Sequence, residues 1–206
     1  MNTNFEVVKD VMLSRGSVKR YDTYEMPKEE LDELLTLAAS APSAWNLQHW
    51  RYLAIQSEEA KQRLLPIAYS QVQVTESSVV IVILGDTEAN QAAPLVYGEE
   101  LKQGHMTQAV HDMFLGQIEG AYQNKQYARD AAFSNASLSA MQLMLAAKAK
   151  GFDTCAMGGF NKEALVKEFN IPDRYVPVMI ITVGKAAQPA RPTSRLNLDT
   201  VVLETL

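Results

Sequence analysis

Residues 78–84, SVVIVIL, contain the longest strongly apolar run of the chain and are followed directly by Gly85 and Asp86. A short run of Val and Ile that ends at a glycine is typical of a β-strand buried on both faces. The run is far shorter than the roughly 20 residues that a membrane-spanning helix needs, so it predicts no membrane span.

The sequence before this strand predicts three helices and one further strand. Val8, Val11 and Met12 have helical spacing and predict a short amphipathic helix over 4–13. A second helix should begin at Pro27, because proline and the following glutamates favour a first helical turn, and its apolar stripe is Leu31, Leu34, Leu35 and Ala38. The segments 50–56 (WRYLAIQ) and 57–69 predict a strand and a helix.

The sequence after the strand predicts mostly helix, followed by two more strands. We expect helices with loose connections over 87–126 and a long helix over 127–150, whose buried face is marked by Leu138, Met141 and Leu145. Strands over 152–157 and 178–183 flank a short helix at 161–169. Because helices and strands alternate without a regular βαβ series, the pattern favours an α+β fold over a doubly wound sheet.

The last segment differs in composition from the rest of the 206-residue chain. Residues 186–206 hold Pro189 and Pro192 and few apolar side chains, so they cannot form a core of their own. We expect residues 1–185 to be one core domain and 186–206 to be an extension. The extension is either free or lies along another surface, such as that of a partner chain.

Composition and missing motifs exclude several classes of function. The net charge of −5 disfavours nucleic-acid binding, and a single cysteine, Cys155, excludes a disulfide framework or a multi-cysteine metal site. The three histidines lack the spacing of a metal triad, and no phosphate-binding P-loop, GxGxxG or GxSxG pattern is present. With no secretory signal at the N-terminus, we expect a soluble cytoplasmic protein that binds no metal, membrane or nucleic acid.

Four short segments could carry chemistry, although each also has a plain structural interpretation. Residues 15–19 (RGSVK) place two cations and a hydroxyl in one loop, which suits an anion or a solvated connector. Residues 41–48 (APSAWNLQ) suit either the polar edge of a heterocycle or an ordinary turn. Gly158-Gly159 could permit a positive φ and a close approach of backbone to ligand, or form a strand-to-helix turn. The fourth segment is 192–195 (PTSR).

In this order and spacing, the four segments resemble the FMN-dependent nitroreductase family over nearly the whole chain. The matching elements are R-x-S-x-K at Arg15, A-P-S-x-x-N-x-Q-x-W at 41–50, G-G-F after a strand, and Arg195 in the tail. The resemblance implies a central, mostly antiparallel sheet flanked by helices. It also implies an intertwined homodimer that exchanges C-terminal tails and holds two FMN molecules at its interface.

The resemblance assigns the phosphate and the N1 edge of FMN to the N-terminal loop and the tail. Arg15 and Arg195 would hold the phosphate, with Gly16 in the same loop and Ser17 as a neutral donor. Lys19 would lie near the N1/O2 edge of the flavin, where reduction leaves negative charge.

The ring itself would be held by three other groups of residues. Pro42, Ser43 and Asn46, with Gln48 in the same segment, would come from the partner subunit. The pyrimidine side would meet Ser70, Gln71 and Gln73. Gly158 and Gly159, preceded by Met157, would lie along the isoalloxazine and present a backbone N–H towards N5. The chain departs from the family pattern at Gly16, at Ser70 and at His49, which stands where proline is more usual.

The implied activity is transfer of hydride from NAD(P)H through flavin N5 to a nitroaromatic, a quinone or a similar flat acceptor in a ping-pong cycle. No catalytic side chain is implied, because FMN supplies the chemistry. Tyr97, Phe114 and Tyr122 could form a wall for the acceptor or could simply be core residues. Two alternatives stay open: a flavin-binding reservoir or sensor without turnover, and an enoate, flavin or dehalogenating reductase on the same scaffold.

Overall fold

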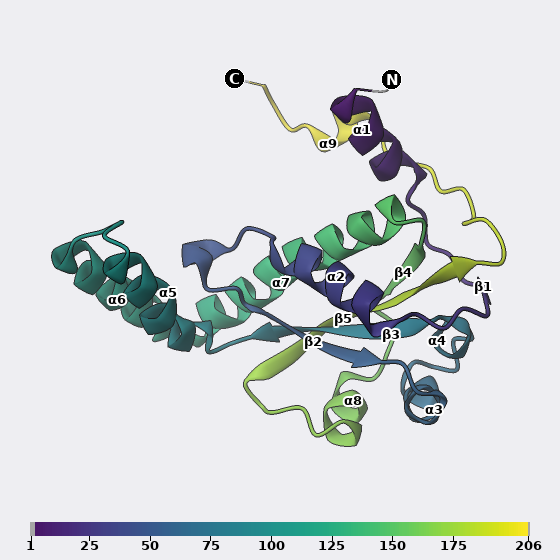
Figure 1. Ribbon diagram of the computed structural model, residues 1–206, viewed down its shortest axis with the longest axis horizontal. Coiled ribbons are helices and arrows are strands. Elements are labelled where there is room, and N and C mark those ends of the chain that lie inside the picture. Colours follow the sequence, from purple (N-terminus) through teal and green to yellow (C-terminus); the bar gives the residue numbers. More distant parts are fainter. Residues whose placement is uncertain (1–2, 206) are drawn as a thin grey trace.

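Strand β3 (Val79–Asp86) is the centre of the fold and is buried along its whole length. The computed structural model describes residues 3–205 and places β3 between two antiparallel neighbours, β2 (Trp50–Ile55) and β5 (Tyr175–Ala186) (Figure 1). Two further strands, β4 (Asp153–Met157) and β1 (Tyr21–Asp22), pair antiparallel with β5 and complete a five-stranded sheet.

Helices cover the sheet on both faces, as the β-branched run in β3 requires. Val79, Ile81 and Ile83 face one core cluster, which packs under α2 (Lys28–Ala39) and α7 (Lys125–Ala149). Val80, Val82 and Leu84 face a second cluster with α3 (Glu58–Ile67) and α8 (Lys162–Glu168). Figure 1 shows these two pairs of helices on opposite sides of the strands. The sequence prediction of a strand buried on both faces is therefore confirmed.

Helix α7 turns a different face to the sheet from the one predicted. Leu138 and Met141 are 48% and 39% exposed, whereas the buried side of the helix consists mainly of small residues such as Ala132, Ala136 and Ala140. Small side chains let the helix axis approach the sheet closely, so packing selected the alanine face over the stripe of larger residues. The predicted face was therefore wrong, and those larger side chains lie on the outside of this chain.

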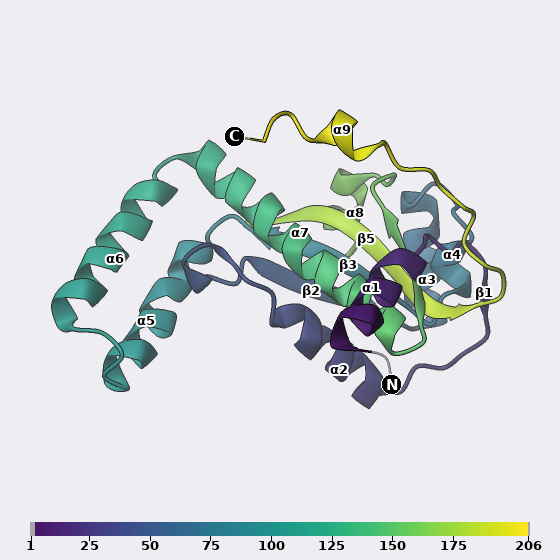
Figure 2. The ribbon, with the colours of Figure 1, turned by 90° about the horizontal axis from the view of Figure 1, so that it is seen from above.

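A helical hairpin extends from one end of α7 and carries a third core cluster. Its helices are α5 (Ala93–Lys102), preceded by the short η2 (Ala89–Ala92), and α6 (Gln108–Tyr122). Leu47, which follows the short helix η1 (Ala44–Asn46), is fully buried between them with Tyr97 and Ile118. Figure 2 shows the hairpin projecting away from the sheet. Helices with loose connections were predicted for this part of the chain.

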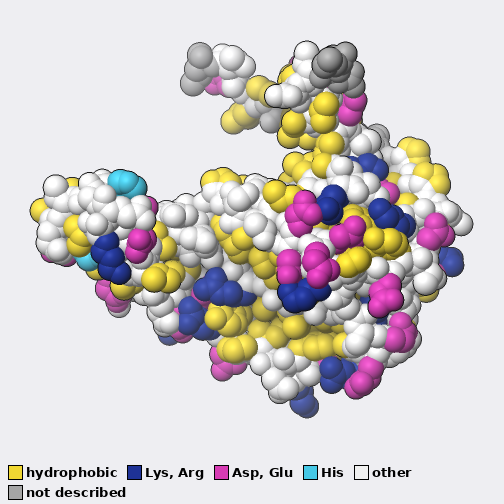
Figure 3. Space-filling model, viewed as in Figure 1, with side chains coloured by type: hydrophobic (Ala, Val, Ile, Leu, Met, Phe, Trp, Pro, Cys, Tyr) yellow, Lys and Arg dark blue, Asp and Glu magenta, His cyan; other side chains and the backbone are white. Residues whose placement is uncertain are grey.

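The N-terminal helix and the C-terminal tail lie outside the body of the molecule. Every residue of α1 (Asn4–Ser14) is exposed or half-buried, and the tail beyond β5 runs in extended conformation to the short helix α9 (Leu198–Val201). Figure 1 shows α1 and α9 both above the sheet, whereas the perpendicular view in Figure 2 shows them apart. Figure 3 shows hydrophobic side chains on this side of the molecule.

Short elements and strand ends were the least predictable parts. The sequence did not indicate β1, α9 or α4 (Gln73–Glu76), and β5 is longer than the predicted strand at 178–183. The tail leaves the sheet after Ala186, close to the predicted start of the extension. Among residues 3–205, no helix combines the length and the apolar character needed to cross a membrane.

Candidate functional site

A cleft of about 390 Å³ lies where the end of α1 meets the C-terminal tail. Arg15 and Gly16 line it from one side, and Arg191, Thr193 and Arg195 line it from the other. The two segments pass so closely that a Cβ atom built on Gly16 would clash with the Cβ of Ala190. The structure thus brings together the two arginines that the family resemblance assigns to the phosphate of FMN.

Residues 17–19 run beside the edge of β4. Ser17 forms a parallel bridge with Thr154, and the Val18 backbone N–H donates to the Thr154 carbonyl over 3.0 Å. Burial raises the pKa of the Cys155 thiol, and the nearby cation of Lys19, the Ser17 hydroxyl and Arg15 partly offset this rise. These three side chains therefore share one edge of the sheet. Within residues 3–205, neither Arg15 nor Lys19 forms an ion pair with a carboxylate.

Two glutamines join the loop after α3 to the carboxyl end of β4. The Gln71 amide donates to the Gly159 carbonyl over 2.9 Å, and the buried Gln73 amide donates to the Gln71 side-chain oxygen over 3.1 Å and contacts the Met157 sulfur. Ser70 precedes them with a left-handed φ of +56° and is exposed. The structure thus places Gln71 and Gln73, predicted for the pyrimidine side of the flavin, next to Met157 and Gly159, predicted to lie along the isoalloxazine ring.

The two glycines after β4 leave open space beside the backbone and have ordinary backbone conformations. Neither Gly158 nor Gly159 adopts the positive φ that the sequence analysis allowed for. In the part of the chain that the structure describes, no heavy atom lies within 4 Å of a Cβ built on Gly158, and both residues are exposed. The backbone here is therefore accessible to a flat ligand.

The loop 42–48 holds a strained conformation. Trp45, Asn46 and Gln48 all have left-handed φ angles of +50° to +52°, each of which costs a non-glycine residue about 1 kcal/mol or more. Such strain persists only where surrounding contacts enforce it, and it is concentrated at functional sites. The Ser43 hydroxyl accepts the Gln48 backbone N–H over 3.0 Å, so its position is fixed within the loop.

The cationic cleft and this loop lie towards opposite ends of α7 in one chain. The Ala44 backbone N–H donates to Asn135 in the first half of α7, whereas α1 packs beside Ala146 and Ala149 at its far end. At 1.5 Å per residue, these points of α7 are about 16 to 21 Å apart. The structure therefore does not bring Pro42, Ser43, Asn46 and Gln48 together with Arg15 and Arg195 of the same chain.

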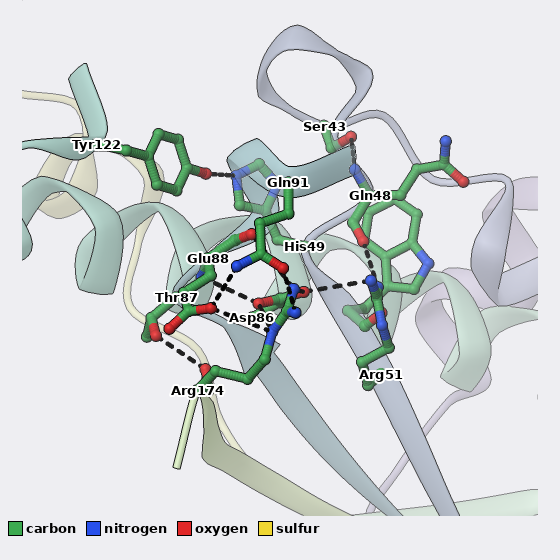
Figure 4. Close-up of polar contacts among 11 residues, drawn as sticks. Ser43, Gln48, His49, Arg51, Asp86, Thr87, Glu88, Gln91, Tyr122 and Arg174 are labelled. Carbon is green, nitrogen blue, oxygen red and sulfur yellow. Dashed lines mark hydrogen bonds and ion pairs between the residues drawn. The ribbon is translucent and has the colours of Figure 1, made fainter. Parts of the chain in front are cut away.

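A buried ion-pair cluster that the sequence analysis missed holds the base of this loop. The Asp86 carboxylate is fully buried and accepts two hydrogen bonds from Arg174, over 3.0 and 2.7 Å, while Arg51 lies 3.2 Å away. Arg51 also donates to the Gln48 carbonyl over 3.0 Å. Figure 4 shows the two arginines approaching Asp86 from different sides. The sequence signal that could have indicated this cluster was the charged residue Asp86 at the end of the strongly apolar run that forms β3.

His49 connects this cluster to the hairpin. Its carbonyl accepts the Asp86 backbone N–H over 2.6 Å, and its Nε2 shares a hydrogen bond of 2.8 Å with the Tyr122 hydroxyl (Figure 4). Burial lowers the pKa of His49 to about 4, so the ring is neutral near pH 7. Tyr97 is buried in the third core cluster, and Phe114 and Tyr122 are partly buried against it, so all three contribute to packing in this chain. A further role as a wall for the acceptor stays a prediction.

Residues 12–185 match the model of the nitroreductase family. The Bacillus subtilis protein named "Putative NAD(P)H nitroreductase YodC" is 58% identical over 193 residues, covering 93% of this chain and 96% of that protein. A protein of Lactiplantibacillus plantarum named "CLA biosynthesis enone reductase" is 34% identical, covering 93% of this chain and 91% of the relative.

A solved structure from Exiguobacterium sibiricum, described as a putative nitroreductase in complex with FMN, superposes with a TM-score of 0.90. The two chains are 37% identical, and the match covers 100% of this chain and 99% of the other. The predicted α+β fold with its antiparallel sheet is thereby confirmed. On the extent of the family match and the identity of these relatives, the chain belongs to the nitroreductase family.

Proposed function

We propose that this protein is an FMN-dependent oxidoreductase that uses NAD(P)H as reductant. The observation that carries the proposal is the cleft lined by Arg15, Arg191 and Arg195, which come from the two ends of the chain. A flavin phosphate carries about −1.5 to −2 charges at pH 7, and guanidinium forks bind such a group through charge-assisted hydrogen bonds. In residues 3–205 these arginines lack carboxylate partners, so their donors suit an external anion.

The remaining side chains around the cleft fit the rest of the cofactor. Ser17 would add a neutral donor at the phosphate, and Lys19, on the same edge of β4, would attract the negative charge that reduction leaves at N1/O2. The exposed backbone at Gly158 and Gly159 leaves room for a flat ring, and the Gln71 and Gln73 amides beside it suit the polar pyrimidine edge.

Bound FMN would supply the redox chemistry by accepting hydride from NAD(P)H at N5 and passing two electrons to a nitroaromatic, a quinone or a similar flat acceptor in a ping-pong cycle. The chain's own groups then have to bind, orient and tune the flavin. Lys19 would make electron uptake more favourable, and the open face above Gly158 would receive the nicotinamide and the acceptor in turn.

We further propose that the working unit is a homodimer in which the partner's Pro42, Ser43, Asn46 and Gln48 complete each site. Several large apolar side chains are exposed in the single chain; Leu13 and Leu198, for example, are 76% and 71% exposed. A groove of about 290 Å³ between α1 and the outer face of α7 is lined by Val8, Met12 and Leu145 among others. Apolar surface of this kind marks an interface between proteins, and the exposed tail 186–206 would lie along the partner.

Anaerobic reduction tests the proposed activity. Purified protein carrying FMN should lose its yellow colour when NADPH or NADH is added and regain it when menadione follows. Bleaching without reoxidation by quinones or nitroaromatics would instead identify a flavin reservoir or sensor. Unchanged absorbance with either nicotinamide would refute the reductase.

The phosphate assignment has its own test. The Arg195→Gln variant should bind FMN much more weakly and bind riboflavin, which lacks the phosphate, as the unchanged protein does. The Arg63→Gln variant serves as a control, because Arg63 is exposed and pairs with Glu168 on the opposite face of the sheet. Equal FMN affinity in the Arg195→Gln variant and the unchanged protein would contradict the assignment.

The tail assignment is tested by truncation. A chain that ends at Lys185 should sediment as a monomer and lose FMN. A truncated chain that still forms dimers and retains flavin would refute a tail that wraps the partner.

The similarity to an enone reductase favours a second candidate for the acceptor. An activated C=C bond next to a carbonyl is flat and accepts hydride, so the same open face could receive it. Steady-state rates with matched quinone, nitroaromatic and enone acceptors would separate the two, because the physiological class should give the highest kcat/KM.

A further inference from the structure

Two tyrosine hydroxyls at the base of the α5–α6 hairpin bind the loop that contains Ser43 and Asn46. The Tyr97 hydroxyl, from α5, donates to the Trp45 carbonyl over 3.0 Å. The Tyr122 hydroxyl, at the last residue of α6, shares its 2.8 Å hydrogen bond with His49 Nε2. The hairpin therefore holds the loop near its beginning and at its end.

The side chain between these two points is also held by the hairpin. Leu47 is fully buried in the cluster formed with Ala93, Tyr97 and Ile118. Leu47 therefore packs against both helices of the hairpin, and a tyrosine hydrogen bond holds the chain on either side of it, at Trp45 and at His49. Movement of the hairpin base would move the loop with it.

The loop needs such external support because its own hydrogen bonds are few and local. Asn46 N–H donates to the Ser43 carbonyl and Leu47 N–H to the Ala44 carbonyl, over 3.0 and 3.1 Å. Each of these bonds spans a single turn. They do not offset the conformational strain of the three residues with left-handed φ angles, Trp45, Asn46 and Gln48. The direction in which Ser43 and Asn46 point therefore also depends on the groups that fix the loop from outside, which are the hairpin tyrosines together with Asn135 and Arg51.

We propose that Tyr97, Tyr122 and His49 are positioning residues that set flavin affinity by fixing the loop which presents Ser43 and Asn46 to the cofactor of the opposite subunit. The inference rests on the proposed function, because the contact of Ser43 and Asn46 with flavin is part of that proposal. It makes the hairpin of one subunit a determinant of cofactor binding in the other.

The protonation states of the three groups support this role. Burial raises the pKa of both Tyr97 and Tyr122, so their hydroxyls keep their protons. Burial lowers the pKa of His49 to about 4, so the ring keeps a free acceptor nitrogen at neutral pH. The loop is therefore held by neutral, partly buried hydrogen bonds, which have directional geometry.

Hydroxyl deletions test the proposal with little risk to folding. In the dimer carrying FMN, Tyr97→Phe and Tyr122→Phe should each weaken FMN binding about 3- to 10-fold, the range expected for one lost hydrogen bond. The visible circular dichroism of the bound flavin should change in both variants, because the contacts of the ring shift. Tyr24→Phe is the matched control, since its hydroxyl bonds Glu30 at α2 over 2.9 Å, far from the loop.

The comparison of variants separates positioning from general loss of stability. Even if Tyr24→Phe lowers the Tm as much as Tyr97→Phe or Tyr122→Phe does, it should leave the FMN Kd and the flavin dichroism unchanged. His49→Leu should reproduce Tyr122→Phe, and the two changes together should cost no more than one, since they break the same bond. An unchanged FMN Kd in the Tyr97→Phe/Tyr122→Phe double variant, or an equal loss in Tyr24→Phe, would overturn the proposal.

A readout in the flavin-free protein keeps this test separate from that of the proposed function. Trp45 lies in the loop and is half-buried, whereas Trp50 is 4% exposed, so acrylamide quenching of fluorescence reports chiefly on Trp45. Quenching should rise in the tyrosine variants and not in Tyr24→Phe. If the unchanged protein bound no FMN, the proposed function would fail; unchanged quenching in the variants would refute the positioning role by itself.

Discussion

Replacement of Gly85 by alanine should destabilise the fold strongly, because β3 lies in close contact with α7 there. A Cβ atom built on Gly85 would lie 2.8 Å from the carbonyl oxygen of Ala132 and 2.9 Å from its carbonyl carbon. Favourable contacts between heavy atoms lie at about 3.5 to 4.0 Å. The added methyl group would therefore require a movement of roughly 0.7 Å between strand and helix.

Neither neighbour can move easily. Gly85 pairs with Trp50 of β2 on one side and with Val176 of β5 on the other, and the atoms of Ala132 that it would meet are mainly backbone. Overpacking of a core without room to relax costs about 1 to 3 kcal/mol, and this site should lie at the upper end, at about 3 kcal/mol.

Urea unfolding of the flavin-free protein, followed by circular dichroism at one fixed protomer concentration, measures the effect. Gly116→Ala is the matched control: Gly116 lies exposed within α6, and a Cβ built there meets no heavy atom within 4 Å in the described part of the chain. That variant should gain about 0.5 to 1 kcal/mol from helix propensity. If Gly85→Ala unfolded within about 0.5 kcal/mol of the unchanged protein, the close packing inferred here would be refuted.

Three further predictions concern buried polar groups. Asp86→Asn should lower the free energy of unfolding by about 3 kcal/mol, because it removes the buried charge that pairs with both Arg174 and Arg51. Asp32→Asn, which breaks an exposed pair with Lys28, should change it by less than about 0.5 kcal/mol. His49 has a pKa of about 4 when folded and 6.5 as its ordinary value. The unfolded chain therefore binds more protons between these values, and stability should fall by about 2 kcal/mol as pH drops from 6.5 to 4. The His49→Gln variant should lose that part of the pH dependence, and an unaltered pH profile would contradict it. Cys155 is 3% exposed and burial raises its pKa, so a thiol reagent should label it only on unfolding; rapid labelling of the native protein would count against the buried position.

Local patterns in the sequence were enough for the elements that have strong periodicity. The β-branched run of β3 was predicted and is buried as expected. Of the stripe predicted on α2, Leu31, Leu34 and Ala38 are buried and Leu35 is half-buried. For α7 the pattern was ambiguous, because the helix carries small residues on one side and large apolar residues such as Leu138 on another. Which side meets the sheet depends on the space available between helix and strand, and no periodicity encodes that space.

Long-range pairing explains what the sequence could not predict of the site. Asp86 and Arg174 are 88 residues apart, and Tyr122 is 73 residues from His49, so no local spacing relates them. The strand β1 has two residues and exists only through its pairing with β5. The convergence of Arg15 with Arg195 was expected from the family resemblance, and their role towards FMN stays a prediction.

The separation of the cationic cleft from the strained loop along α7 has a consequence for mixtures of defective chains. In the proposed dimer, a chain damaged at Arg15 and a chain damaged at Ser43 would each be inactive alone, since every dimer of identical chains repeats its own defect. Mixed pairs, however, would contain one site assembled from the two undamaged halves and one site with both defects. Random association would therefore restore flavin to about one quarter of all sites. An inactive Arg15 variant and an inactive Ser43 variant, expressed together in one cell, should therefore complement each other.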